Sequence, residues 1–209
     1  MFRLKICGIT NLEDARAAVD GGAPALGFIF HPQSPRCLTP EAAAAIAESL
    51  PSPIARVAVQ VGWDEAQTRR LESLMRVDYF QLHGAESPAQ AAALRPRRLI
   101  KAFGLPLPPD APHPPSAYAV DAFLMDKASP RYGGTGETFD WTLARTFQQA
   151  AAPLPCLLSG GLNPDNVEQA LETVQPWGID VCSGVEASPG RKDHAQLARF
   201  LQLCRPLLT

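Results

Sequence analysis

The chain has 209 residues, of which 46% are hydrophobic, and a formal net charge of −2 at pH 7. That length fits one domain with a sizeable core and lies near the lower limit for an eight-unit β/α barrel. The charge provides no basic field for nucleic acid, and no apolar run reaches the ~20 residues that span a bilayer, so neither nucleic-acid nor membrane binding is expected.

Short apolar runs alternate with helical patterns along the whole chain. The runs are mostly continuous, which is typical of parallel strands buried on both faces. They predict strands over 3–7, 25–30, 55–61, 78–82, 98–103, 120–126, 155–159 and 179–183. Helices are predicted over 11–20, 40–49, 64–75, 87–94, 140–150, 164–174 and 192–204. Thr10 or Asn11 is the expected cap of the first helix, and Gly21-Gly22 its end.

The fifth unit departs from this alternation. Residues 105–115 contain six prolines in eleven positions, which no helix interior tolerates. We interpret the segment as a shortened barrel unit, with a linker between domains as the alternative. Because the alternation continues on both sides, a single domain over 1–209 is preferred. The pattern permits a closed (β/α)8 TIM barrel or an open doubly wound α/β sheet, and the repeat count favours the barrel.

Two candidate catalytic residues follow predicted strands. Cys7 ends the first strand, just before a helix whose N-terminal N–H groups favour a thiolate, so it can act as a base. A small buried hydrophobe is the competing interpretation of this cysteine. Asp126 ends the sixth strand, where barrel enzymes carry catalytic residues, although it could instead cap a loop or pair with Lys127.

Two glycine turns follow the last two strands. They are Ser159-Gly160-Gly161 and Ser183-Gly184, and a helix begins near Asn163. Backbone N–H groups approach an anion closely where glycine has no side chain, and barrels bind phosphate at this position. Either turn alone would be an ordinary tight turn. Together they predict a phosphate site at Gly160, Gly161, Ser183 and Gly184.

Other polar positions on the same expected face are ambiguous. Arg36 follows the second strand and could hold a carboxylate through two parallel hydrogen bonds, or be a solvated arginine. His83, two residues after Gln81, could carry a proton or be structural, and we do not assign it as the base. The glycine-rich loop 132–136 suits a lid and a plain linker equally well.

The five cysteines form no metal or disulfide pattern. They are odd in number, widely spaced and without a C-x-x-C pair: Cys7, Cys37, Cys156, Cys182 and Cys204. This spacing argues against a disulfide framework and a structural zinc site. With no N-terminal signal pattern either, a cytoplasmic protein without a bound metal is expected.

A series of ordered motifs carries a resemblance to a known family. The motifs are KICGIT at 5–10, GFIF at 27–30, SPR at 34–36, QLHG at 81–84, GGTG followed by FDW within 133–141, LSGGLNPDNV at 158–167, DVCSGVE at 180–186 and PGRKD at 189–193. Over essentially its whole length the chain resembles the N-(5′-phosphoribosyl)anthranilate isomerases of tryptophan biosynthesis. That family is made of (β/α)8 barrels that catalyse an Amadori rearrangement of an aminoribose phosphate without metal or organic cofactor.

The resemblance implies roles for individual residues. Asp126 would be the general acid that protonates the furanose ring oxygen, and Cys7 the general base that removes the proton at C2. The acid must start protonated and the base as thiolate, which needs a lowered thiol pKa. Arg36 would contact the anthranilate carboxylate, Asp180 would lie beside the substrate amino group, and the two glycine turns would hold the phosphate. Gln81 and His83 are further candidate substrate-binding residues.

Three positions depart from the family pattern. Gln60 stands where an aromatic residue is more frequent, Glu137 where lysine is frequent, and Cys182 replaces a serine-like residue.

Two other functions compete with that of the family. One alternative is a bifunctional isomerase that also serves histidine biosynthesis, but no second phosphate turn after strand three or four supports it. The other is a non-catalytic barrel that binds a partner, against which Cys7 and Asp126 argue. A monomer or a homodimer is compatible with the sequence.

Overall fold

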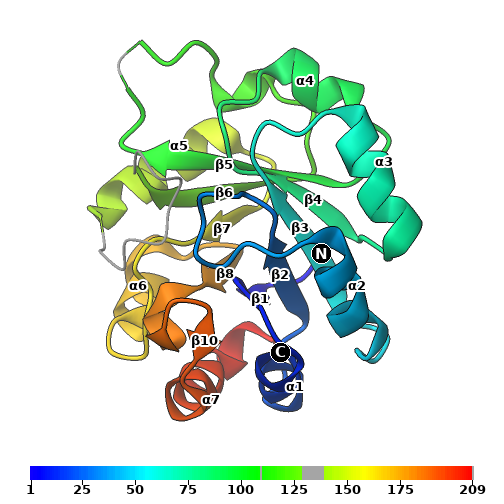
Figure 1. The fold of residues 1–209 in the computed structure, drawn as a ribbon. Helices are drawn as coiled ribbons and strands as arrows, with labels where there is room; N and C mark the ends of the chain where they lie inside the picture. The colour runs from blue at the N-terminus through cyan, green and yellow to red at the C-terminus, as the bar shows by residue number, and fades with distance from the viewer. Residues whose placement is uncertain (109, 129–138, 209) are drawn as a thin grey trace.

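Eight parallel strands close a barrel in the computed structural model, which describes residues 1–108, 110–128 and 139–208. The strands are β1 (Leu4–Ile6), β2 (Ala25–Ile29), β3 (Ala55–Gln60), β4 (Tyr79–Leu82), β5 (Leu99–Leu105), β6 (Ala122–Lys127), β7 (Cys156–Leu158) and β8 (Gly178–Val181). The helices around them are α1 (Leu12–Asp20), α2 (Pro40–Glu48), α3 (Glu65–Leu74), α4 (Pro88–Ala93), α5 (Trp141–Ala151), α6 (Val167–Val174) and α7 (His194–Leu203). Figure 1 shows the helices on the outside of the strands. The closed barrel is confirmed, and the open-sheet alternative is wrong.

The ends of the helices follow local side-chain chemistry. Asn11 caps α1 by accepting a hydrogen bond from the backbone N–H of Asp14 at 2.8 Å, and Gly21 ends that helix, both as predicted. Helix α6 begins at Val167, later than predicted. The reason is that the Asn166 side chain accepts from the N–H of Asn163 at 2.9 Å and donates to the carbonyl of Gly161 at 2.9 Å. These bonds hold the preceding residues in a turn.

Helix α3 offers a test of capping in the outer ring of helices. The exposed Asp64 accepts from the N–H of Gln67 at 2.8 Å, and the Gln67 side chain accepts from the N–H of Asp64 at 3.1 Å. We expect Asp64→Ala to lower the free energy of unfolding by about 1 kcal/mol, because alanine has no side-chain acceptor for the N–H of Gln67. Denaturant unfolding measures the change. Asp64→Ser, which keeps an acceptor, should retain most of the stability, and equal losses in the two variants would contradict the capping argument.

The proline-rich fifth unit lies within the barrel. Strand β5 pairs with β6 from Ile100 opposite Ala122 to Leu105 opposite Lys127. Among the described residues between these strands, the one helical turn is the 3₁₀ turn Pro115–Ala117. Because β5 and β6 are direct neighbours, the segment is a connection within one barrel rather than a linker between domains. The shortened unit is confirmed.

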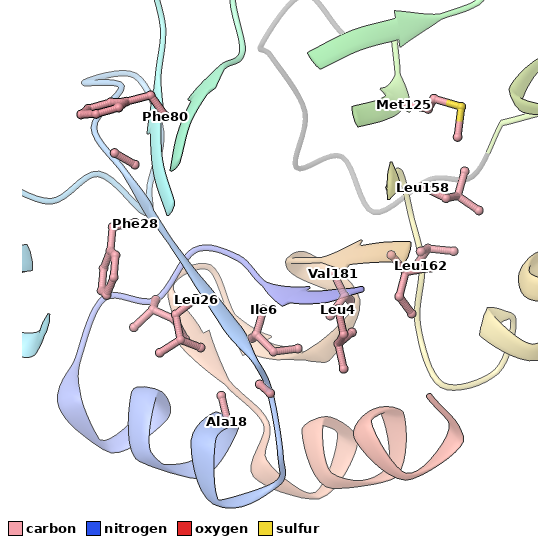
Figure 2. Packing of buried hydrophobic residues seen from close by; sticks show 14 of the residues in the cluster. Leu4, Ile6, Ala18, Leu26, Phe28, Phe80, Met125, Leu158, Leu162 and Val181 are labelled. Carbon is pink, nitrogen blue, oxygen red and sulfur yellow. The ribbon is translucent and has the colours of Figure 1, made fainter. Parts of the chain in front are cut away.

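Two apolar clusters divide the core. Alternate residues of the strands, joined by Phe2, form the smaller one, which fills the barrel interior: Phe2, Ala25, Val57, Tyr79, Ile100, Ala102, Ala122, Leu124 and Leu157. The larger cluster lies between strands and helices, where Ile6 and Leu26 lie close to Ala18 of α1 (Figure 2). Side chains alternate along a strand, so Lys5 and Cys7, on either side of Ile6, face the interior.

A short hairpin follows β8. It consists of β9 (Glu186–Ser188) and β10 (Arg191–Lys192), which pair antiparallel and precede α7. The periodicity of the sequence did not predict these strands. Along the described ranges, none of the helices has both the length and the apolar character needed to cross a membrane.

Candidate active site

The two predicted catalytic residues, Cys7 and Asp126, and the predicted substrate-binding residue His83 lie at the C-terminal ends of the barrel strands. Cys7 directly follows β1, His83 follows β4, and Asp126 is the next-to-last residue of β6. Cys7 and Asp126 are nearly buried, with 5% and 8% of their surface exposed. In a barrel β1 and β6 are separated by β7 and β8, so these two groups approach the mouth from different sides. A small molecule between them would meet both.

Asp126 is oriented by two contacts. Its Oδ1 accepts a hydrogen bond from the backbone N–H of Lys127 at 2.7 Å, and its Oδ2 lies 3.3 Å from Nε2 of His83. The Gln81 amide nitrogen lies 2.7 Å from Nδ1 of His83. An amide nitrogen only donates, so Nδ1 accepts and the ring proton of a neutral His83 is on Nε2, facing Asp126. The predicted residues Gln81, His83 and Asp126 are therefore brought together.

Cys7 lies within a second group that sequence patterns did not reveal. Its thiol interacts with the thiol of Cys182 and lies beside the ammonium group of Lys5. Gly27 on the neighbouring strand makes room for this arrangement, because a Cβ there would lie 2.8 Å from Sγ of Cys7 and 2.9 Å from Nζ of Lys5. Thiol and ammonium therefore occupy the same small space above Gly27.

The two thiols titrate as a pair. The hydrogen bond to Cys182, followed by burial, raises the pKa of Cys7 well above its usual range. The hydrogen bond from Cys7, with the charges of Lys192 and Arg36, lowers the pKa of Cys182 to about 7 against the effect of burial. The expected lowering of the pKa of Cys7 itself is wrong. Because one thiol stabilises the other as thiolate, the pair loses its first proton near neutral pH and its second only far above.

Asp180 forms a buried ion pair with Lys5. The two residues are register partners on β8 and β1, and Oδ1 of Asp180 lies 2.9 Å from Nζ of Lys5. Burial raises the pKa of Asp180, and Lys5 opposes part of that rise. Burial alone would lower the pKa of Lys5, but Asp180 and Cys7 together raise it above its usual value. Lys5 is therefore a cation inside the barrel.

Arg36 is held by a residue of the hairpin. Its Nε and Nη2 donate to the two carboxylate oxygens of Glu186 at 2.8 and 2.6 Å, and these bonds raise the pKa of Arg36. The Lys192 ammonium also donates to Glu186 at 3.1 Å, and to the carbonyls of Cys7 and Cys182 at 2.7 and 2.9 Å. Arg36 is buried, so the solvated-arginine interpretation is wrong. Within the described ranges its third guanidinium nitrogen, Nη1, makes no hydrogen bond and is left for a ligand.

The glycine turns after β7 and β8 lie against each other. A Cβ on Gly184 would overlap the carbonyl oxygen of Leu162, which follows Gly161. Gly160 and Gly161 have φ of 86° and 68°, in the region that favours glycine. In the part of the chain that the structure describes, the N–H groups of Gly160, Gly161, Ser183 and Gly184 donate to no other backbone group. They can receive an anion.

Some predicted features contribute differently or cannot be placed. The loop 132–136 and Glu137 lie outside the described residues. Gln60 is the register partner of Leu82 and faces the helices rather than the barrel interior. Three buried charged residues were not singled out as functional, although they lie within the quoted motifs KICGIT, DVCSGVE and PGRKD: Lys5, Glu186 and Lys192.

The fold and this site together define a class of protein. A thiol, a carboxyl group and two anion-accepting turns at the C-terminal end of a closed β/α barrel are typical of barrel enzymes that act on small phosphorylated molecules. Comparisons with known proteins identify the member of that class. Residues 4–203 match the family model for N-(5′-phosphoribosyl)anthranilate isomerase. The chain belongs to the N-(5′-phosphoribosyl)anthranilate isomerase family.

Individual relatives agree along almost the entire chain. It is 48% identical over 203 residues to the N-(5′-phosphoribosyl)anthranilate isomerase of Geobacter sulfurreducens, covering 97% of this chain and 98% of that protein. The crystal structure of the Thermotoga maritima isomerase superposes with a TM-score of 0.88 at 39% identity, covering 99% of this chain and all of that one. Another isomerase structure, solved with reduced 1-(o-carboxyphenylamino)-1-deoxyribulose 5-phosphate, gives a TM-score of 0.81 at 34% identity with the same coverage.

Proposed function

We propose that Cys7 and Asp126 carry out, in this chain, the rearrangement of N-(5-phosphoribosyl)anthranilate to 1-(2-carboxyphenylamino)-1-deoxyribulose 5-phosphate. Family membership makes the chain an isomerase of tryptophan biosynthesis. One observation carries the assignment of roles: a thiol and a carboxyl group reach the mouth of one barrel from β1 and β6, with the two glycine turns between them on β7 and β8. A sugar phosphate held by its phosphate at the turns would lie between acid and base.

Asp126 supplies the proton that opens the sugar ring. It protonates the furanose oxygen, and the C1–O bond breaks as the nitrogen lone pair forms an iminium. His83 orients the carboxyl group, because its Nε2–H faces Oδ2 of Asp126 at 3.3 Å. Gln81 in turn orients the ring of His83. We therefore place Gln81 and His83 behind the acid, at the edge of the substrate site.

The thiol pair removes the proton at C2. The electrons of that C–H bond form the C1–C2 double bond of an enolamine and neutralise the iminium, and the enolamine then relaxes to the ketone. Cys7 accepts the proton because it lies on the interior face of the barrel, with Cys182 beside it at the end of β8. A pair that already carries one negative charge near neutral pH needs no external activator.

The remaining predicted residues form the binding site of the proposal. The substrate phosphate accepts hydrogen bonds from the backbone N–H groups of Gly160, Gly161, Ser183 and Gly184. The anthranilate carboxylate binds Nη1 of Arg36, while Glu186 keeps the other two nitrogens in place. Asp180 lies beside the substrate amino group, on the interior face of β8, where it is paired with Lys5.

A fluorescence assay tests the proposed function. Freshly generated phosphoribosylanthranilate is fluorescent, and its fluorescence should decay when the purified chain is added. The decay should be catalytic and should stop when the reduced product analogue is present in excess. A chain that binds the analogue but leaves the decay at its spontaneous rate would instead be a binding protein.

Gly161→Val tests the phosphate site. A β-branched side chain is strained at φ of 68° and would crowd the anion. We therefore expect KM to rise about 10- to 100-fold, which corresponds to the loss of one charge-assisted hydrogen bond, with little change in kcat. Inorganic phosphate should compete with substrate in the parent and lose this effect in the variant. Gly22→Val is the matched control, since Gly22 has φ of 95° at the far end of the barrel, after α1. Equal KM effects in both variants would remove the phosphate role.

We also propose a setting for the enzyme. It acts in the cytoplasm as a single barrel over residues 1–209 on a sugar-phosphate substrate, and it binds neither nucleic acid nor membrane. The net charge of −2 supports the last two points. A homodimer and a monomer are both compatible with the fold, and one related Thermotoga maritima structure is described as a monomeric form of a dimeric isomerase. Light scattering in solution distinguishes the two.

A further inference from the structure

Lys5 is a buried cation for which the proposed chemistry has no use. Its side chain is 0% exposed, and it faces the barrel interior two residues before Cys7. A buried ammonium group is costly unless partners of opposite charge surround it. Asp180 is one partner, at 2.9 Å. The other is the thiol of Cys7, which shares the space above Gly27.

The charges that face the two thiols do not balance. Three cations act on the pair, Lys5 from β1, Arg36 from the loop after β2 and Lys192 from β10, against two carboxylates, Asp180 from β8 and Glu186 from β9. The set therefore has one positive charge in excess, and one thiolate neutralises it. Asp126 and His83 act on Asp180 from across the mouth, while Asp14 lies behind Lys192 and is paired with His194 at 2.8 Å.

Lys5 lies beside the proposed base. Its Nζ and Sγ of Cys7 lie 2.9 and 2.8 Å from the same Cβ position at Gly27, and its charge opposes the rise in the pKa of Cys7, to which Asp180 adds. Arg36 acts on both thiols, and Lys192 donates to the carbonyls of both cysteines, while both cations are also bound to Glu186. Lys5 therefore favours negative charge on Cys7, whereas Arg36 and Lys192 favour it on the pair as a whole.

We propose that Lys5 is a positioning residue for the base: its ammonium group holds the negative charge of the Cys7–Cys182 pair on Cys7, beside the reaction centre. This inference rests on the proposed role of Cys7. It predicts that Lys5 acts through the thiol without touching the substrate, so its loss should change the pH at which the thiol ionises and leave substrate binding intact.

The rate of alkylation of Cys7 by iodoacetamide measures ionisation without any substrate. Mass spectrometry of the peptide that contains Cys7 gives its rate at each pH, since only the thiolate reacts. In the parent, the rate should rise with pH through one midpoint, the pH at which the pair takes on its first negative charge. In Lys5→Met the midpoint should lie about one to three pH units higher, as expected when an adjacent opposite charge is lost.

Two further variants separate this effect from a loss of structure. Lys5→Met leaves Asp180 as an unpaired buried carboxylate, whereas Lys5→Met/Asp180→Asn removes both charges. The double variant should have a midpoint between those of the parent and Lys5→Met. Lys101→Met is the matched control, because Lys101 is also a buried lysine, paired with Glu86 at 3.0 Å, but lies on the outer face of β5. Its midpoint should equal that of the parent.

Kinetics completes the test. In Lys5→Met the acid limb of kcat/KM should follow the alkylation midpoint, so that the rate at pH 7 falls about tenfold for each pH unit by which the midpoint rises, with KM unchanged. A folded Lys5→Met that keeps the alkylation midpoint of the parent overturns the proposal. If Lys5→Met fails to fold, a Lys5→Met/Asp180→Asn variant with the midpoint of the parent overturns it instead. The proposed function fails separately: a parent without isomerase activity would refute it, while the change in the alkylation midpoint would still report on Lys5.

Discussion

Cys7→Ser should lose most of its turnover while it still binds the reduced product analogue. A serine hydroxyl is a far weaker base than a thiolate, and loss of general-base catalysis typically costs about 10²- to 10⁴-fold. Binding should persist because the phosphate turns and Arg36 come from other strands. Steady-state kinetics gives kcat, and titration calorimetry gives the affinity for the analogue.

The neighbouring thiol makes a second variant necessary. Cys182 is hydrogen bonded to Cys7 and has a pKa of about 7, so it could take over part of the proton transfer. Cys7→Ser/Cys182→Ser removes that route. If Cys7→Ser keeps parental turnover and the double variant loses it, the base is Cys182 rather than Cys7. Cys156→Ser is the control for replacing a buried cysteine, since Cys156 lies on the outer face of β7 within the core and should keep its kcat.

The fold could be predicted because each unit carries its own local signals. Continuous apolar runs mark the strands, Asn11 and Gly21 mark the ends of α1, and the prolines of 105–115 exclude a fifth-unit helix. The start of α6 was missed because Asn166 uses its side chain to build the turn after β7 rather than a helix. The β9–β10 hairpin was missed because strands this short leave no periodicity.

The site could be predicted only where one motif contains the functional group. Cys7, Asp126 and the glycine turns each follow a recognisable strand. The partners of these residues come from distant parts of the chain, as Arg36 and Glu186 do, 150 positions apart. The contact between Cys7 and Cys182 depends on β1 pairing with β8, which only closure of the barrel produces. The two-residue alternation that places Lys5 on the same face as Cys7 was the one signal available in the sequence.

Asp126→Asn should abolish ring opening and leave the fold intact. An amide can still accept the bond that Lys127 donates to Oδ1 at 2.7 Å, but it has no acidic proton for the furanose oxygen. We expect kcat to fall about 10²- to 10⁴-fold, the range for loss of a general acid. Single-turnover decay of substrate fluorescence isolates the chemical step, and the circular dichroism spectrum reports on the fold.

A control from the same strand decides whether this effect is chemical. Asp121 precedes β6 at the opposite end of the barrel, where its Oδ2 accepts from the N–H of Leu99 at 2.7 Å and from Arg95 at 2.8 Å. Asp121→Asn also replaces a hydrogen-bonded aspartate by its amide, so it should cost stability but leave kcat unchanged.

A double variant tests whether misplaced hydrogen bonds cause the loss in Asp126→Asn. Because His83 presents Nε2–H to residue 126, the amide of Asp126→Asn must turn its oxygen to one neighbour and its nitrogen to the other. His83→Asn would remove that conflict without restoring an acid, so a double variant with Asp126→Asn should stay inactive. Recovery of turnover in the double variant would show that the loss came from misplaced hydrogen bonds and would remove Asp126 from the acid role.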